Sequence, residues 1–291
     1  MKISITLMGI TRGDVLAEVG RHAERLGFAS LWVPEHLVMP KDIKTPYPYA
    51  DRSQIQVSTT SPFCYPFVTL AYLAAVTRKL RLGTAVCLVG ERHPVILAKE
   101  VATLDCLSGG RVALGVGAGW LPEEFEALGI PYARRGARLA EYITVMRKLW
   151  GEDASSFAGA FISFDAIRSY PKPLSGARLP ILMGGDSAPA LKRAAKLADG
   201  WYGSHLTPDQ VGDRRRHLLD LAESSGRDPR ELEIIASPHR ESATPLHLRA
   251  YQRVGTDELV LHVPRFQQPE EVAPALERLA GIWLPAAAQL E

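Results

Sequence analysis

The chain has 291 residues, and 46% of them are hydrophobic, which is enough to build one large α/β domain with a sizeable core. Its 34 basic residues nearly balance its 32 acidic ones, without a basic block or an aromatic-interleaved basic stripe, so we expect no nucleic-acid partner. The three cysteines lack C-x-x-C spacing, which argues against a disulfide framework or a zinc site, and the absence of a membrane-spanning apolar run favours a soluble protein of the reducing cytoplasm.

Strands and helices alternate along the first half of the chain. Residues 3–7 alternate in polarity as a strand does, and residues 15–26 follow at helical spacing until Gly27 ends the helix. Three more strand–helix pairs are predicted at 30–33 and 67–77, at 80–86 and 94–107, and at 112–116 and 139–150.

The segment 37–66 interrupts this alternation between the second strand and its helix. It has no periodicity, but it is rich in prolines and contains the aromatic residues Tyr47, Tyr49, Phe63 and Tyr65. A loop of this length in a compact domain is usually a lid or a binding loop.

The second half of the chain resumes the alternation after an interruption at 151–179, where a hairpin is possible at 157–164. Strands are predicted at 180–183, 199–202, 232–236 and 258–263, and the helices that follow them at 188–197, 207–224, 246–254 and 269–279. Strict alternation of eight such pairs predicts an α/β fold, a (β/α)8 TIM barrel spanning 1–291 as a single domain, with an insertion between helix 4 and strand 5. An open doubly wound sheet is the alternative.

Glycines cluster at the end of the fourth predicted strand, in residues 109–119. They remove side chains at positions where a ligand could touch the main chain. The dinucleotide fingerprint G-x-G-x-x-G does not fit, because its last position falls on Trp120 when counted from Gly115 and on Pro122 when counted from Gly117. The sequence therefore argues against a Rossmann fold.

Active sites of TIM barrels lie at the carboxyl ends of the strands. That rule selects the segments Glu35–His36, 85–89, 117–124, 184–187, 203–205 and 238–240. Histidine suits proton transfer because it titrates near neutral pH, so His36 is the first candidate; the alternative is a structural histidine bonded to Glu35. Glu123 and Glu124 are either functional or ordinary carboxylates in the first turn of a helix.

The segment Gly184–Ser187 precedes a predicted helix, where backbone N–H groups and the Ser187 hydroxyl could bind a phosphate. The alternative is a tight turn between strand and helix. Asp186 is acidic where the phosphate would approach, so we expect Asp186→Asn to tighten binding. No metal site is expected, because no ligand spacing links the isolated histidines His93, His205, His239 and His262.

Motifs along nearly the whole chain occur in a fixed order. They are Gly27–His36 (GFASLWVPEH), Arg92-His93-Pro94, Leu104–Arg111 (LDCLSGGR), Gly115–Phe125 (GVGAGWLPEEF), Pro171-Lys172-Pro173, Gly184-Gly185-x-Ser187, Arg193-Ala194-Ala195, Ala198–Trp201 (ADGW) and Gly226–Pro229 (GRDP). This ordered set resembles the luciferase-like monooxygenase superfamily, and within it the branch of oxidoreductases that depend on the deazaflavin coenzyme F420.

The resemblance implies a bacterial-luciferase-like barrel that transfers a hydride between F420 and a small organic substrate, and we also expect a homodimer. It implies His36 and Glu124 as catalytic residues, and a non-prolyl cis peptide at Ala85-Val86 in a bulge beside the cofactor. The residues expected to bind the cofactor are Glu35, Ala85, Val86, Ala118, Gly119, Trp120, Glu123, Gly184, Gly185 and Ser187. Trp120 stands where similar sugar-phosphate dehydrogenases place an acidic residue, so a sugar phosphate is not the expected substrate.

Two other functions fit the same residues. The first is a monooxygenase that uses flavin mononucleotide (FMN) and molecular oxygen, since both cofactors have a planar ring and a phosphate-bearing tail. The second is a protein that binds a flavin or deazaflavin without turnover, because a barrel fold does not guarantee catalysis.

Overall fold

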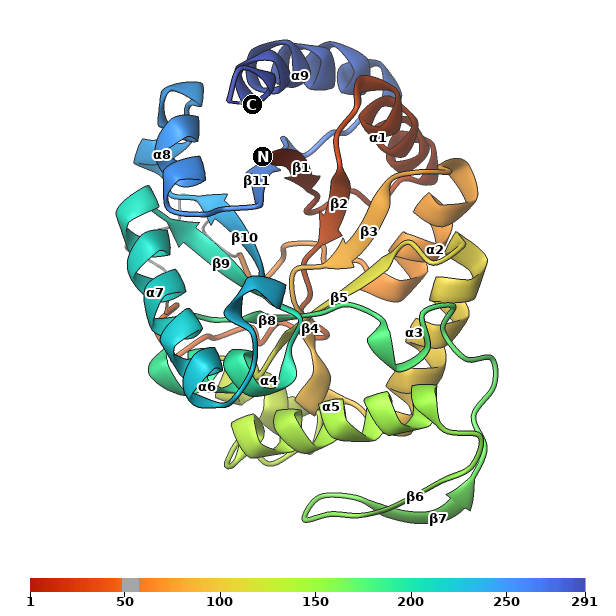
Figure 1. Ribbon diagram of the computed structural model, residues 1–291. Helices are drawn as coiled ribbons and strands as arrows, with labels where there is room; N and C mark the ends of the chain where they lie inside the picture. Colours follow the sequence, from red (N-terminus) through yellow and green to blue (C-terminus); the bar gives the residue numbers. More distant parts are fainter. Residues whose placement is uncertain (49–57, 291) are drawn as a thin grey trace.

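Eight parallel strands close into a barrel in the computed structural model, which describes residues 1–48 and 58–290 (Figure 1). The barrel strands are β1 (Lys2–Thr6), β2 (Ser30–Val33), β3 (Arg81–Thr84), β5 (Val112–Gly117), β8 (Ile181–Gly184), β9 (Gly200–Leu206), β10 (Glu233–Pro238) and β11 (Glu258–His262). Each strand pairs with the next, and β1 pairs with β11 so that Lys2 lies opposite Glu258. The predicted TIM barrel is confirmed, and the open sheet is wrong.

Helices surround the barrel on its outside (Figure 1). They are α1 (Gly13–Leu26), α2 (Pro66–Val76), α3 (Pro94–Ser108), α5 (Arg135–Gly151), α6 (Ala188–Leu197), α7 (Pro208–Ser224), α8 (Leu248–Arg253) and α9 (Val272–Ala288). Helix α9 continues well past its predicted end at residue 279, because Trp283 and Ala287 extend its buried face. None of the helices within 1–48 and 58–290 combines the length and the apolarity that crossing a bilayer requires.

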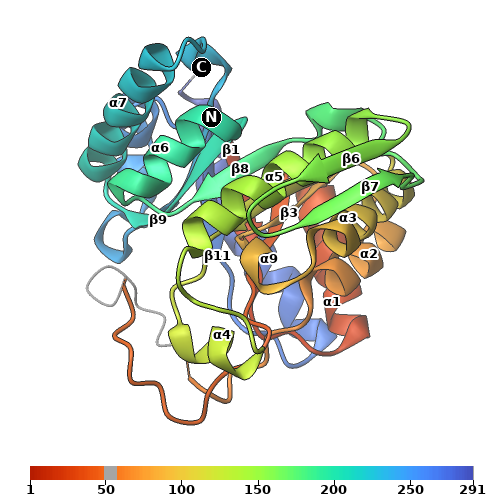
Figure 2. The same ribbon diagram turned by 90° about the horizontal axis from the view of Figure 1, so that it is seen from below.

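The predicted insertion is a hairpin on the outer side of α5 (Figure 2). Strands β6 (Ser155–Ala158) and β7 (Ser163–Ile167) pair antiparallel, with Phe157 opposite Phe164. The Glu141 carboxylate on α5 accepts backbone N–H groups from residues 160–162 at the tip of the hairpin, at 2.8 to 3.0 Å. The hairpin therefore packs along α5 on the outside of the barrel.

The interior of the barrel is plugged by Trp32. Its ring is fully buried, and its Nε1 donates a hydrogen bond of 2.8 Å to the Glu258 carboxylate. A Cβ on Gly83 would lie 2.2 Å from this ring, so only glycine fits at that position of β3. The Tyr202 ring lies above, 5.5 Å from Trp32 between centroids, and also lines the cavity described below. Trp32 and Tyr202 thus fill the barrel interior beneath the carboxyl ends of the strands.

The third strand ends in a bulge that replaces the predicted continuous strand 80–86. The Ala85-Val86 peptide is cis, as expected, and the short strand β4 (Cys87–Leu88) then pairs again with β5. A Cβ on Gly117 would lie 2.6 Å from Val86 Cγ2, and one on Gly184 would lie 2.8 Å from Val86 Cγ1. We expected the glycines at the end of β5 to make room for a ligand. At Gly117 the room is instead occupied by the Val86 side chain.

Candidate active site

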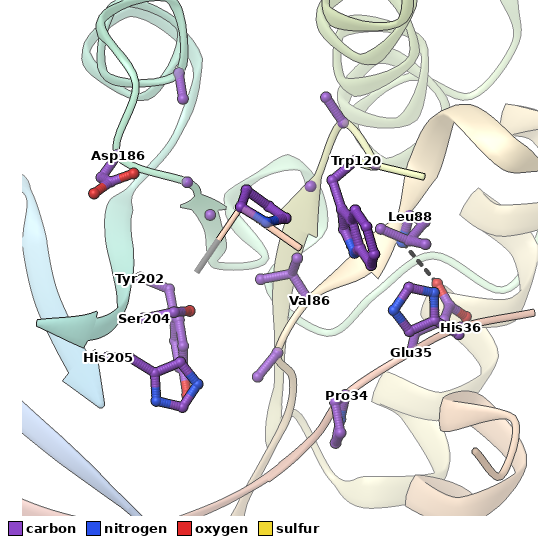
Figure 3. Close-up of a pocket in the computed structure, with 18 of the residues that line it drawn as sticks. Pro34, Glu35, His36, Val86, Leu88, Trp120, Asp186, Tyr202, Ser204 and His205 are labelled. Atoms are coloured by element: carbon purple, nitrogen blue, oxygen red, sulfur yellow. Dashed lines mark hydrogen bonds between the residues drawn. The ribbon is translucent and has the colours of Figure 1, made fainter. Parts of the chain in front are cut away.

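A cavity of about 410 Å³ lies at the carboxyl ends of the barrel strands (Figure 3). The predicted site residues that line it are Glu35, His36, Ala85, Val86, Ala118, Gly119, Trp120, Gly184, Gly185 and Ser187. Glu123 and Glu124 are not part of this lining. Both belong to the short helix α4 (Pro122–Ala127), which starts at Pro122 as the sequence indicates.

His36 is held by Glu124, a residue 88 positions further along the chain. The distance from His36 Nδ1 to Glu124 Oε2 is 2.7 Å, and the Glu124 side chain is only 1% exposed. Glu124 Oε1 also accepts the backbone N–H groups of Leu37, at 2.6 Å, and Val38, at 3.2 Å. Because a carboxylate can only accept, His36 Nδ1 carries the hydrogen and Nε2 is left for a bound molecule. The view of Glu124 as an ordinary first-turn carboxylate is wrong, and so is the pairing of His36 with Glu35.

Glu35 instead forms a buried ion pair with Arg92. Two hydrogen bonds join the groups, at 2.6 Å and 2.9 Å, and Glu35 Oε2 also accepts the Leu88 N–H at 2.6 Å. Arg92 also donates to the sulfur of Cys87, whose thiol pKa is raised well above its ordinary value by complete burial. This network attaches the end of β2 to β4. Glu35 therefore lines the cavity as a residue that holds the wall in place.

Glu123 binds the loop that follows β2 and does not line the cavity. Its carboxylate accepts the backbone N–H groups of Lys44 and Thr45 at 2.9 Å and 3.0 Å, and the Thr45 hydroxyl as well. Glu123 thus lies outside the cavity lining, and its expected contact with a cofactor stays a prediction that this geometry does not support. The two adjacent glutamates of α4 tie down two different parts of the same loop, which a sequence pattern of two first-turn carboxylates does not reveal.

Aromatic rings form one wall of the cavity. Trp120 is half-buried, and its ring meets His36 at 5.9 Å and Tyr47 at 5.2 Å between centroids. Phe63 packs edge-on against His36 at 5.1 Å. Tyr47 and Phe63 come from the predicted lid or binding loop, so its described part does border the cavity, whereas Tyr49 lies outside the described residues.

A corner of the cavity formed by Ser187, Arg135 and Arg193, here called the anion corner, carries positive charge. Ser187 precedes α6 and makes no side-chain cap, so its hydroxyl stays accessible at a helix start. Arg193 Nε is buried without a hydrogen-bond partner among the described residues, and burial, followed by the charge of Arg135, lowers the Arg193 pKa. Sequence reasoning missed both arginines. For Arg193 the sequence did hold a signal: Ser187, Ala190 and Arg193 are spaced three residues apart, which places them on one face of α6.

Asp186 also lines the cavity next to the anion corner (Figure 3). Its carboxylate lies 3.7 Å from Arg214 Nε on α7, in a partly exposed ion pair. That arginine offsets some of the repulsion which the sequence predicts between Asp186 and a phosphate.

Glu91, in the short 3-10 helix Val89–Glu91, is a third residue that sequence reasoning missed. It is 4% exposed, and neither carboxylate oxygen has a hydrogen-bond partner among the described residues. Its Oε1 lies directly behind the cavity wall, 3.1 Å from where a Cβ on Gly119 would be. Burial, then the charges of Glu124 and Glu35, raise the Glu91 pKa to about 9, so this carboxyl is neutral at pH 7.

Two histidines that are isolated in the sequence meet in the cavity wall. The rings of His205 and His262 stack with centroids 5.1 Å apart. No three His, Cys, Asp or Glu side chains converge on a possible metal position in the part of the chain that the structure describes.

Comparison with known proteins places the chain in a family. Residues 6–289 match the model of the luciferase-like monooxygenases. The chain belongs to the luciferase-like monooxygenase family. An uncharacterised protein of Mycobacterium tuberculosis is 32% identical over 284 residues, covering 97% of this chain and 98% of that protein.

Two further similar proteins, one in sequence and one in fold, are named for different cofactors. An FMNH2-dependent dimethylsulfone monooxygenase of Pseudomonas putida is 37% identical over 139 residues, covering 46% of this chain and 38% of that protein. The structure of an F420-dependent secondary alcohol dehydrogenase, in complex with an F420–acetone adduct, superposes with a TM-score of 0.76 at 18% identity and covers 98% of each chain. The barrel fold of this chain thus occurs in an enzyme named for F420, and a sequence relative is named for FMNH2.

Proposed function

We propose that the protein is an F420-dependent oxidoreductase that transfers a hydride between the coenzyme and a small organic substrate. The observation that carries the proposal is the buried His36–Glu124 pair, which faces the same cavity as a separate anion corner. A proton-handling group and an anchor for an anionic tail, on opposite parts of one cavity, are what a hydride-transfer enzyme with a phosphate-bearing coenzyme needs.

The residues of the cavity fit such a coenzyme. The bulge at Ala85-Val86 supplies an apolar surface for a planar ring, and the anion corner offers two guanidinium groups and a helix start for a phosphate. Arg193 in particular is half-buried, and its Nε is buried without a hydrogen-bond partner among the described residues, so a bound phosphate would supply an acceptor for it. When bound, the coenzyme would supply the hydride chemistry.

The protein's own part in the reaction is to position groups and move a proton. Glu124 fixes the His36 ring through Nδ1, so Nε2 is the atom that gives a proton to the substrate or takes one from it. Trp120, Tyr47 and Phe63 would pack around the reacting groups and exclude water. A homodimer and a cytoplasmic location stay predictions.

The second candidate is an FMN-dependent monooxygenase, favoured by the similarity to the dimethylsulfone monooxygenase. The anion corner suits the phosphate of either cofactor. Support for F420 comes from the ordered motifs of the sequence and from the shared fold of the F420-dependent alcohol dehydrogenase.

The test is to identify by mass the cofactor that the purified full-length protein retains, or binds when F420 and FMN are offered together. The proposal predicts F420. Retention of FMN with no affinity for F420 would replace it with the monooxygenase. A bound cofactor with no turnover of any substrate or artificial acceptor, in wild type and His36→Ala alike, would favour the protein that binds without turnover.

A further inference from the structure

The rings beside His36 form a pocket of their own within the cavity. Tyr47, Phe63 and Trp120 line the cavity together with His36, and all three rings remain partly exposed. These four side chains are here called the aromatic pocket. In Figure 3, Trp120 and His36 lie on the same side of Val86. Apolar ring surface thus stays open to a bound molecule at the end of the cavity where His36 acts.

Neighbouring walls of the aromatic pocket stand at steep angles to one another. The ring planes of Phe63 and Trp120 meet the His36 imidazole at 74° and 88°, and Tyr47 meets Trp120 at 68°. A flat ring that stacks on one wall therefore presents its edge or its face to the next. Stacked and edge-to-face contacts are the two arrangements that aromatic pairs prefer, so the pocket favours an aromatic ring over a saturated one of the same size.

Hydrogen bonds hold these walls in place before a molecule binds. The Tyr132 hydroxyl donates to the backbone carbonyl of Trp120 at 3.2 Å. Arg265 donates to the Ser61 hydroxyl at 3.1 Å, two residues before Phe63. Because the backbone that carries the rings is already fixed, a ligand loses little affinity to ordering them.

The ionisable groups around the aromatic pocket are already paired or uncharged. Glu124 accepts from His36 Nδ1, so its carboxylate balances the charge when His36 takes up a second proton. Glu35 is bound by Arg92 through two hydrogen bonds, and Glu91 is neutral at pH 7. Within the part of the chain that the structure describes, this pocket therefore offers no uncompensated charge to a carboxylate or an ammonium group.

We propose that the aromatic pocket binds the ring of an uncharged aromatic substrate that carries a hydroxyl or carbonyl oxygen. His36 Nε2 accepts a proton from a hydroxyl when the imidazole is neutral and donates one to a carbonyl oxygen when it is protonated. The inference rests on the proposed function in one respect, that the bound molecule is the substrate of the oxidoreductase. Oxidation would then move the O–H proton of the alcohol to Nε2 and its C–H hydride to the coenzyme, leaving a C=O bond, and reduction is the reverse. Binding itself is measurable without turnover.

The experiment follows binding at Trp120 in full-length protein labelled with 5-fluorotryptophan. All five tryptophans lie within the described residues and Trp120 alone is not buried, so its 19F signal, assigned with Trp120→Phe, reports on the pocket. The probes are benzyl alcohol, cyclohexylmethanol, benzoate and benzylammonium, each titrated with and without cofactor.

Benzyl alcohol should shift the Trp120 signal and bind about two- to tenfold more tightly than cyclohexylmethanol, which is the value of one aromatic contact. The two charged probes should bind at least about tenfold more weakly than benzyl alcohol. Cyclohexylmethanol or a charged probe that binds as tightly as benzyl alcohol would overturn the proposal, and so would a Trp120 signal that benzyl alcohol leaves unmoved. These comparisons need no substitution in the pocket.

Variants separate the rings from the rest of the cavity. Phe63→Leu keeps an apolar side chain but removes the ring, and should abolish the preference for benzyl alcohol over cyclohexylmethanol, whereas Phe63→Tyr should retain it. Phe164→Leu, the same change at a half-buried position of the β6–β7 hairpin, should leave the preference unchanged. A wild-type preference in Phe63→Leu would refute the inference.

The outcome also distinguishes this inference from the proposed function. Failure to bind either F420 or FMN would refute the proposed function, while the probe titrations would still decide whether the pocket selects an uncharged aromatic ring. Cofactor binding together with equal affinities for benzyl alcohol and cyclohexylmethanol would refute the inference alone.

Discussion

Replacing Glu91 by glutamine tests whether the cavity wall holds a neutral carboxylic acid. The Glu91 pKa is raised from 4.5 to about 9, chiefly by burial and then by the charges of Glu124 and Glu35. In the unfolded chain the same carboxyl titrates near its ordinary value. Between these two pH values the folded protein keeps a proton that the unfolded chain releases. The contribution of Glu91 to the free energy of unfolding is therefore fully present below about pH 4.5 and is lost progressively as the pH rises toward 9.

The size of the effect follows from the difference of one bound proton. Each pH unit within that window changes the free energy of unfolding by about 1.4 kcal/mol, so between pH 5.5 and 7.5 the wild type should lose roughly 3 kcal/mol relative to Glu91→Gln. Glutamine keeps the shape of the side chain and cannot ionise. Any constant cost of burying its amide shifts all pH values equally and does not alter this slope.

Urea unfolding followed by circular dichroism at pH 5.5, 6.5 and 7.5 measures the difference between variant and wild type. Glu126→Gln, the same change on the exposed side of α4, is the matched control and should show no such slope. A Glu91→Gln difference that stays constant over the three pH values would mean that Glu91 is ionised in the folded protein, and the burial argument would be refuted.

Three further substitutions test the roles assigned to single residues. His36→Ala should lower turnover by about 10² to 10⁴ and remove one limb of the pH–rate profile while sparing cofactor affinity; turnover within about twofold would make His36 structural. Arg193→Gln should weaken FMN or F420 binding by roughly tenfold or more but leave riboflavin, which lacks the phosphate, unaffected; an equal loss for riboflavin would remove Arg193 from the anion corner. Gly117→Ala should cost about 1 to 3 kcal/mol in urea unfolding, because its Cβ would lie 2.6 Å from Val86; wild-type stability would contradict that packing.

Periodicity in the sequence was sufficient to predict the barrel and the region of its site. Eight alternations of strand and helix specify a closed parallel sheet, and the carboxyl ends of those strands supplied most of the cavity lining, including His36 and Trp120. The insertion was also predictable, because residues 151–179 break the alternation and Phe157 and Phe164 fit a hairpin.

Side-chain partnerships were not predictable in the same way, since they join distant parts of the chain. Adjacency in sequence suggested that Glu35 supports His36, whereas the partner is Glu124 from another element. The glycines at the end of β5 looked like a ligand surface, but a bulge in a different strand fills the space at Gly117. His205 and His262 are separated by more than fifty residues and meet only when the barrel closes.

Competitive titration of F420 and FMN into the full-length protein, followed by calorimetry, tests the central proposal most directly. The account predicts tight F420 binding that Arg193→Gln weakens and that FMN displaces only at much higher concentration. Binding of FMN alone, with no heat on addition of F420, would contradict it.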